Sequence, residues 1–132
     1  MSSISLILLL YEVSIIGGES LEILGCSFRH NTAVFGAGAL AVGSTSRTDV
    51  IRCNFENNAV RSSFGSGGSI ELEFEFTFSE SGKGLALVSE SNFTNSFAPF
   101  AGGAISSTVP GNVTVERSTF TNCVAEIGAA CT

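Results

Sequence analysis

A phenylalanine followed three residues later by a small polar residue recurs along this chain, and this recurrence constrains the fold more than any other feature. The four copies are FRHN at 28–31, FENN at 55–58, FTNS at 93–96 and FTNC at 120–123. Their phenylalanines are 27, 38 and 27 residues apart, and the middle spacing is a 27-residue unit with 3 residues added before Ile70 and 8 added before Phe93. A fixed period whose insertions fall in connections is typical of a solenoid.

The residues before each phenylalanine alternate between core-forming and polar types with the period of two of a β-strand. The positions two, five and seven residues before it hold small or apolar side chains: Cys26, Cys53, Ser91 and Ser118; Ile23, Val50, Val88 and Val115; Leu21, Thr48, Ala86 and Val113. The positions between them are mostly polar: Glu22, Asp49, Leu87 and Thr114; Ser27, Asn54, Asn92 and Thr119. Each copy therefore predicts at least one strand with an inward face.

A second strand is expected after each phenylalanine, where small residues introduce an apolar segment. These segments are GAGAL at 36–40, GSGGSI at 65–70 and AGGAI at 101–105. Glycines such as Gly68 and Gly103 permit the positive φ or the close backbone approach that such a corner requires. The same alignment reaches the N-terminal residues, since Val13 takes the place of Leu40.

These patterns predict an all-β chain, a right-handed parallel β-helix that forms a single-stranded solenoid of about four coils. Residues 1–20 are predicted to form an N-terminal partial coil, and residues 21–132 the β-helix repeat region, with coils centred on Phe28, Phe55, Phe93 and Phe120. Neither end shows an obvious cap, so we expect an uncapped fragment that stacks with neighbouring coils of a longer parent chain.

Stacked coils place equivalent side chains one above another, about 4.8 Å apart, and so predict structural ladders. The four phenylalanines form an interior aromatic ladder. Asn57, Asn95 and Asn122, with His30 at the equivalent place, form a polar ladder at the following corner, because Asn tolerates a left-handed backbone. Asn31 and Asn58 make a second, shorter ladder. Cys26 and Cys53 face inward on adjacent coils as a stack of thiols or a disulfide, and serine at the same position in the next two coils favours the thiols.

The pairing of FxxN with GGA(I/L/V) resembles the repeat of the chlamydial polymorphic outer membrane proteins and related β-helix repeats of other microbes, within the pectate-lyase-like superfamily. The matching residues are Phe28 with Asn31, Phe55 with Asn58, Gly67-Gly68-Ser69-Ile70 and Gly102-Gly103-Ala104-Ile105. FTNS and FTNC lose the final Asn, and GAGAL loses the first glycine pair. The resemblance covers about residues 21–132 and implies a secreted or outer-membrane surface passenger, autotransported in the bacterial members and associated with adhesion.

Composition bears on the partners. The net charge is −6 and the six basic residues are scattered singly, so no basic stripe is present to neutralise phosphates. Nucleic acid is therefore not expected as a partner, and neither is an anionic membrane surface. The apolar run from Ile4 to Leu10 is far shorter than the roughly 20 residues that span a bilayer. A secretory signal there is the less favoured alternative, because no basic residue precedes the run and Glu12 follows it closely.

Residues suited to catalysis or metal binding are sparse. Asp49 is the single aspartate, and His30 is the single histidine and has the place of a corner residue. Glu71, Glu73 and Glu75 alternate with apolar residues and are predicted to be the solvated face of a strand. Cys123 and Cys131 lack the CxxC spacing of a zinc or redox site; they are predicted to be small buried residues, with a local disulfide as the alternative. Asn92 and Asn112 begin glycosylation sequons, which we attribute to chance matching. No catalytic residue, metal or cofactor is predicted.

Two functions remain in competition. The first is a non-enzymatic structural or adhesive surface module that binds a host-cell or surface protein or a glycan, with the insertion between Glu73 and Leu85 as a candidate partner-facing feature. The second is a fragment of a carbohydrate-active β-helix enzyme, a polysaccharide lyase or hydrolase, whose catalytic coils lie elsewhere in the parent chain.

Overall fold

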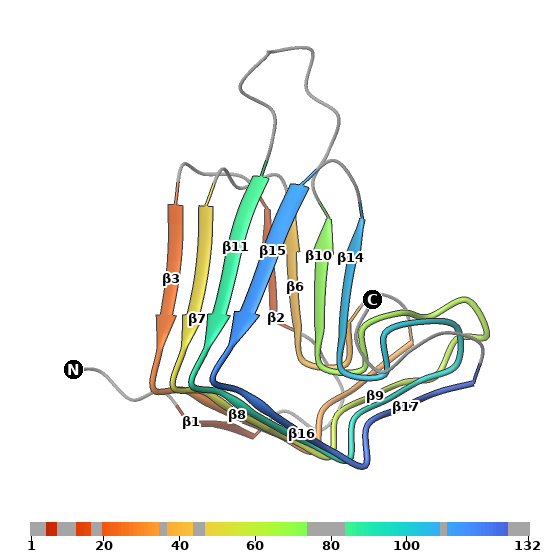
Figure 1. Cartoon of the computed structure of the whole chain (residues 1–132). Helices are drawn as coiled ribbons and strands as arrows, with labels where there is room; N and C mark the ends of the chain where they lie inside the picture. Colours follow the sequence, from red (N-terminus) through yellow and green to blue (C-terminus); the bar gives the residue numbers. More distant parts are fainter. Residues whose placement is uncertain are drawn as a thin grey trace.

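The computed structural model describes residues 5–7, 13–16, 20–34, 37–43, 47–73, 84–108 and 111–126. In these residues the regular elements are all strands, arranged in four parallel sheets (Figure 1). No helix that is long and apolar enough to cross a bilayer occurs within these ranges.

Each sheet collects one strand from successive coils. The phenylalanine sheet contains β1 (Ser5–Ile7), β4 (Ser27–Arg29), β8 (Asn54–Glu56), β12 (Asn92–Thr94) and β16 (Thr119–Thr121). The isoleucine sheet contains β2 (Val13–Ile16), β6 (Leu40–Gly43), β10 (Ile70–Glu73) and β14 (Ile105–Thr108). The long-strand sheet contains β3 (Ser20–Leu24), β7 (Arg47–Ile51), β11 (Gly84–Ser89) and β15 (Gly111–Glu116). The short-strand sheet contains β5 (Thr32–Ala33), β9 (Ala59–Val60), β13 (Phe97–Ala98) and β17 (Val124–Ala125).

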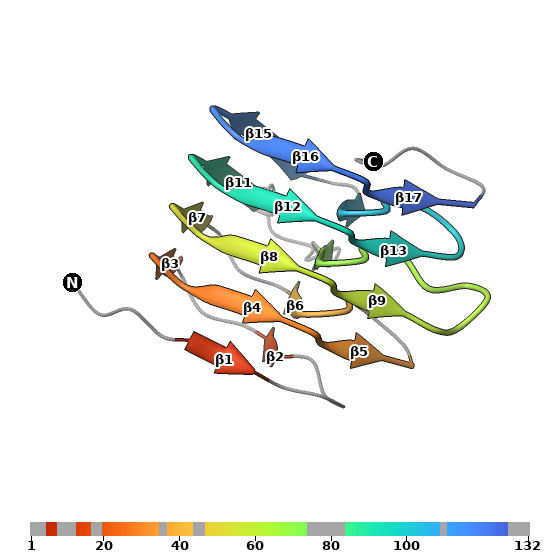
Figure 2. The same ribbon diagram turned by 90° about the horizontal axis from the view of Figure 1, so that it is seen from below.

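The chain passes through the long-strand, phenylalanine, short-strand and isoleucine sheets in turn, and then begins the next coil (Figures 1 and 2). In Figure 1 this path runs anticlockwise while later coils lie nearer the viewer, so the solenoid is a right-handed parallel β-helix. The predicted fold class is confirmed.

The strands pair without any shift in register. Phe55 pairs with Phe28 on one side and with Phe93 on the other. β2 pairs with β6 through Val13 and Leu40, the equivalence that the sequence alignment predicts. Ile70 pairs with Leu40 although 30 residues separate them, because the added residues fall in the turn after β9 and leave the strands aligned. The same side chain type therefore recurs at the same depth of the core.

The phenylalanine rings stack along the interior with their planes parallel to within 4°. The ring centroids are 4.9, 4.7 and 4.9 Å apart along the series. These separations match the spacing of hydrogen-bonded strands and lie in the range of offset-stacked aromatic pairs. Phe28, Phe55 and Phe93 are buried, whereas Phe120, in the last coil described, remains 36% exposed.

Each coil turns at two corners where the backbone adopts positive φ. One corner lies two residues after the phenylalanine, at His30, Asn57, Asn95 and Asn122, with φ between 52° and 56°. The other lies three residues before it, at Gly25, Arg52, Glu90 and Arg117, with φ between 47° and 60°. The sequence indicates the first corner through its asparagines. It does not indicate the second, because arginine and glutamate rarely adopt this conformation.

The glycine-rich segments bring the backbones of two sheets into close contact. Gly68 packs so tightly that a Cβ there would overlap the carbonyl oxygen of Gly103 and lie 2.6 Å from the amide nitrogen of Phe97. A Cβ on Gly103 would in turn lie 2.5 Å from the carbonyl carbon of Val124. Glycine is required at these two positions by proximity, since neither has a positive φ.

Candidate binding face

The buried polar side chains of the interior bond from coil to coil. The Asn58 side chain, fully buried, accepts hydrogen bonds from Asn31 N and Asn31 Nδ2 at 3.1 and 3.0 Å. Its Nδ2 donates to the carbonyl of Phe28 at 3.0 Å and to Ser69 Oγ at 3.3 Å. Ser96, which replaces the asparagine in the next coil, bonds to the same Ser69 hydroxyl at 2.6 Å. These groups hold coils together and face no solvent.

The cysteines of the inner ladder are free thiols. Cys26 and Cys53 are both buried and unbridged, and Cys53 Sγ lies 3.4 Å from the carbonyl oxygen of Ile51. Desolvation by burial, together with the neighbouring Cys26 thiol, raises the pKa of Cys53 to about 11. The Cys53 thiol therefore stays protonated and unreactive at neutral pH. Of the second predicted pair, Cys123 is free and half-buried, and Cys131 lies outside the described residues.

The corner ladder after the phenylalanine lies at the surface. Asn95 Nδ2 donates to Asn57 Oδ1 at 3.0 Å. Asn122 and His30 are exposed at the same corner of their coils. His30 therefore has the place of an asparagine in the ladder, which is a structural role.

The outward side of the long-strand sheet, which we call the outer face, combines charged, polar and apolar side chains. Its residues form three rows across the strands: Ser20, Arg47, Leu85 and Asn112; Glu22, Asp49, Leu87 and Thr114; Leu24, Ile51, Ser89 and Glu116. Leu85 is 48% exposed although it lies within a strand. The sequence pattern places polar residues at outward positions, and the two leucines of β11 depart from it, as do Leu24 and Ile51.

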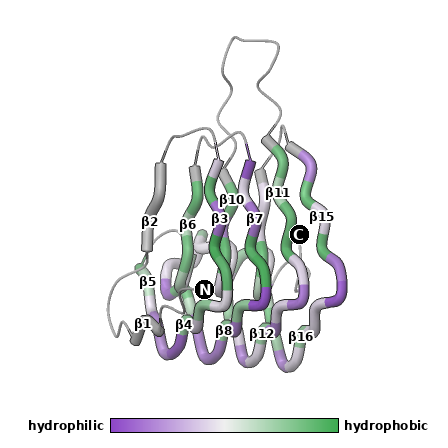
Figure 3. Tube along the Cα trace, turned by 90° about the vertical axis from the view of Figure 1, so that its left-hand side faces the viewer, coloured by the Kyte–Doolittle hydropathy of each residue, from purple (hydrophilic) through white to green (hydrophobic). Residues whose placement is uncertain are grey.

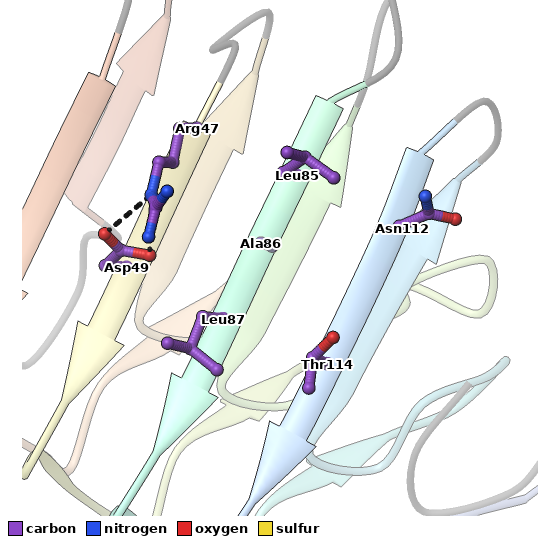
Figure 4. A pocket seen from close by; sticks show the side chains of 7 residues that line it. All are labelled: Arg47, Asp49, Leu85, Ala86, Leu87, Asn112 and Thr114. Atoms are coloured by element: carbon purple, nitrogen blue, oxygen red, sulfur yellow. Dashed lines mark hydrogen bonds and ion pairs between the residues drawn. The ribbon is translucent and has the colours of Figure 1, made fainter.

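A shallow hollow of about 200 Å³ lies on this face between β7, β11 and β15 (Figure 4). Leu85 and Leu87 form its apolar middle, and Asn112 and Thr114 line the β15 side. On the β7 side, Arg47 Nε bonds to both carboxylate oxygens of Asp49 at 3.3 and 3.0 Å. The hollow thus offers apolar contact between two polar borders.

Asp49 is the single aspartate of the sequence, but in the structure it has another carboxylate as a neighbour. Glu22 lies opposite it in the strand register, so two carboxylates are neighbours on the outer face. Parallel register puts such residues about 4.8 Å apart, and like charges at this separation destabilise each other unless a cation lies between them. Arg47 bonds to Asp49, and Glu22 is exposed at the edge of the face.

An apolar ridge marks a different corner of the solenoid. Phe64 is 84% exposed in the turn after β9, and Phe100, 43% exposed, follows β13 on the next coil. The amide of Phe100 donates to the carbonyl of Gly65 at 3.0 Å, so the two turns lie side by side. Arg61 and Ser63 are also exposed in the first of these turns.

Other predicted features fall partly outside the described residues. The insertion between Glu73 and Leu85 is described only at its ends, and Glu75 is not described. Glu71 is half-buried beside a fully buried Leu72, as its predicted alternation requires. Of the sequon asparagines, Asn92 Oδ1 accepts a hydrogen bond from Thr119 Oγ1 at 2.6 Å, and Asn112 borders the hollow.

Comparison of the chain with protein-family models, with curated proteins and with solved structures gives no match. The FxxN and GGA motifs therefore remain a resemblance in sequence pattern. In the part of the chain that the structure describes, no three His, Cys, Asp or Glu side chains gather as a metal site would require.

Proposed function

We propose that this chain is a non-enzymatic binding module and a segment of a larger cell-surface or secreted protein. Its outer face binds a surface protein or a glycan. The observation that carries the proposal is the exposed Leu85, which lines a hollow with polar residues on two sides. The inward side of the same sheet packs its side chains into the core. A contiguous exposed apolar patch rimmed by polar groups is typical of interaction sites, and Leu85 is continued on the same strand by the half-buried Leu87.

The division of chemistry between the two sides of the long-strand sheet supports this proposal. The inward side chains of this sheet, such as Ile23 and Val50, are buried, and the interior polar groups beyond its strands, Asn58 and the Cys53 thiol, bond to other coils. The outward groups, among them Arg47 and Asn112, reach solvent. Parallel stacking makes this face stiff, because β7 and β11 at its centre are paired with neighbouring strands on both sides, and a stiff face loses little entropy on binding.

The test uses the fluorescently labelled chain applied to cultured cells and to immobilised surface proteins and glycans. We expect saturable binding that Leu85→Arg abolishes and that Phe64→Ser, a change at the apolar ridge, leaves unchanged. Both variants should keep the far-UV circular dichroism spectrum and the melting temperature of the wild type, since both side chains are exposed. Equal loss in the two variants, or no binding by the wild type, would refute the assignment.

The carbohydrate-active alternative predicts a different result. Incubation of the parent protein with pectin-like polymers would release reducing or unsaturated sugars, and Asp49→Asn or Glu22→Gln would stop the release if the outer face were the active site. Release that depends on these carboxylates would overturn the binding proposal in favour of catalysis.

A further inference from the structure

The apolar residues of the outer face form a diagonal stripe across three strands. Leu24 and Ile51 are paired in the bottom row on β3 and β7, and Leu87 and Leu85 continue the stripe upward along β11. Figure 3 views the solenoid from this side and shows apolar residues in the lower parts of β3 and β7 and along β11. Leu24, Ile51 and Leu87 are half-buried and Leu85 is more exposed, so part of each side chain faces solvent.

The dimensions of the stripe suit one kind of occupant. It crosses two strand spacings of about 4.8 Å and four residues of about 3.3 Å each, which makes a diagonal of about 16 Å. An α-helix rises 1.5 Å per residue, so about 11 residues, three turns, cover this length. The apolar stripe of such a helix is formed by residues three and four apart, which present side chains in a line. Among the described residues, Leu85 remains 48% exposed, so this end of the stripe is open to a partner.

The charges beside the stripe indicate which charge the docked helix should have on its flank. Along the border of the stripe on β3 and β7, Glu22 and Asp49 are neighbours, and Arg47 bonds to Asp49. On this border two carboxylates and one guanidinium leave one excess negative charge, at the exposed Glu22, whereas the exposed Arg52 follows Ile51 at the lower end of the stripe. Along the opposite border Glu116 bonds to Arg117 at 3.1 Å. A lysine or arginine on the flank of a docked helix would complement the charge at Glu22.

From this geometry we infer that the outer face docks a basic amphipathic helix of about three turns belonging to a partner protein, with its apolar stripe on Leu24, Ile51, Leu87 and Leu85 and a cationic flank beside Glu22. The inference rests on the proposed binding function, because it assigns a partner to the same face. The face spans four strands and three rows, which is smaller than a standard protein interface, so binding is weak, with a Kd of about 10⁻⁴ M.

The experiment uses the full chain and two synthetic 14-residue helical probes. One probe has leucines at helical spacing with lysines on the flanks, and the other has the same leucines with glutamates in place of the lysines. Fluorescence anisotropy measures the Kd, and NMR chemical-shift changes in the 15N-labelled chain locate the probe. We expect the lysine probe to bind at least tenfold more tightly than the glutamate probe and to shift the amides of β3, β7 and β11.

Matched variants separate docking from general attraction to an acidic chain. Leu85→Ser should weaken the lysine probe about tenfold, and Glu22→Gln about threefold with a smaller preference for lysine over glutamate. Glu126→Gln removes the same charge from an exposed site after β17, and Phe64→Ser removes an exposed aromatic from the ridge; both should leave the Kd unchanged. An equal effect of Glu22→Gln and Glu126→Gln, shifts confined to other sheets, or no binding at 1 mM probe would overturn the inference.

The two proposals can fail independently. If neither probe binds while cell binding still depends on Leu85, the face is a binding site for a different occupant and only the helix is refuted. If the lysine probe docks on the face while the chain binds no cell, surface protein or glycan, the helix is supported and the adhesive role fails.

Discussion

Replacing Asn58 by alanine tests whether the buried polar ladder holds the coils together. The Asn58 side chain is fully buried and makes four hydrogen bonds, to Asn31 N, Asn31 Nδ2, the carbonyl of Phe28 and Ser69 Oγ. Alanine fills less space and cannot bond to any of them. Ser69 keeps its bond to Ser96, so the groups that lose a partner belong to Asn31 and Phe28.

The expected cost follows from these lost partners. A hydrogen bond contributes a net stabilisation of about 0.5–1.5 kcal/mol, and the four bonds that Asn58 makes together give a loss of about 4 kcal/mol. A chain of 132 residues has a free energy of unfolding of about 7–20 kcal/mol, so the variant loses a substantial part of it. With an m-value of about 2 kcal/mol/M in urea, the midpoint of unfolding falls by about 2 M.

The assay is urea unfolding followed by far-UV circular dichroism. The matched control is Asn57→Gly, one residue away, which keeps the positive φ of 55° and removes one surface hydrogen bond, to Asn95. We expect this control to change stability by less than about 1 kcal/mol. A midpoint shift below 0.5 M for Asn58→Ala, or equal shifts in the two variants, would refute the structural role of the ladder.

Three further predictions concern the core and its corners. Phe55→Ala should cost about 3–5 kcal/mol in urea unfolding, and Phe120→Ala clearly less because that ring is 36% exposed; equal costs would contradict the described stack. Gly68→Ala should lower the melting temperature sharply because its Cβ overlaps backbone. Gly25→Asn should cost much less, because no atom lies within 4 Å of a Cβ there and asparagine tolerates its φ of 60°; similar melting temperatures for the two variants would show that the corner at Gly68 is not tight. Cys53 should resist iodoacetamide at pH 8 in the native chain, as read by mass spectrometry, and react in urea. Its folded pKa of about 11 exceeds the ordinary 9.0, so the neutral thiol's contribution to stability is complete below pH 9 and is lost as pH rises through 11. An equal loss of stability between pH 9 and 11 in the wild type and in Cys53→Ser would contradict this.

Much of the fold could be predicted because a solenoid repeats one local pattern. Phe28 and Phe55 are 27 residues apart, and one such spacing fixes both the length of a coil and the identity of the stacked neighbours. The alignment of Val13 with Leu40 follows from the same period. The insertions did not obscure it, since they lie in connections.

The parts that the sequence did not predict depend on contacts between sheets or on the outer side of a strand. Ser69 reads as an ordinary small residue before Ile70, and its bonds to Asn58 and Ser96 emerge only when two corners meet. The sequence does not distinguish Leu85, because an exposed leucine in one coil breaks no core pattern. The alignment of the repeats pairs Glu22 with Asp49. The excess negative charge of this pair becomes apparent only when both side chains are seen to point outward from the same sheet.

The turn after β9 separates chain length from strand alignment. Residues 61–65 take up three more positions than the matching turn of the next coil, yet Ser66 still meets Ala101 and Ile70 still meets Ile105. Extra sequence at this point is accommodated outside the stack, so foreign peptides grafted between Ser62 and Gly65 would be displayed without disturbing the layers above and below. The solenoid can in this way acquire new specificities one loop at a time, while its interior stays as it is.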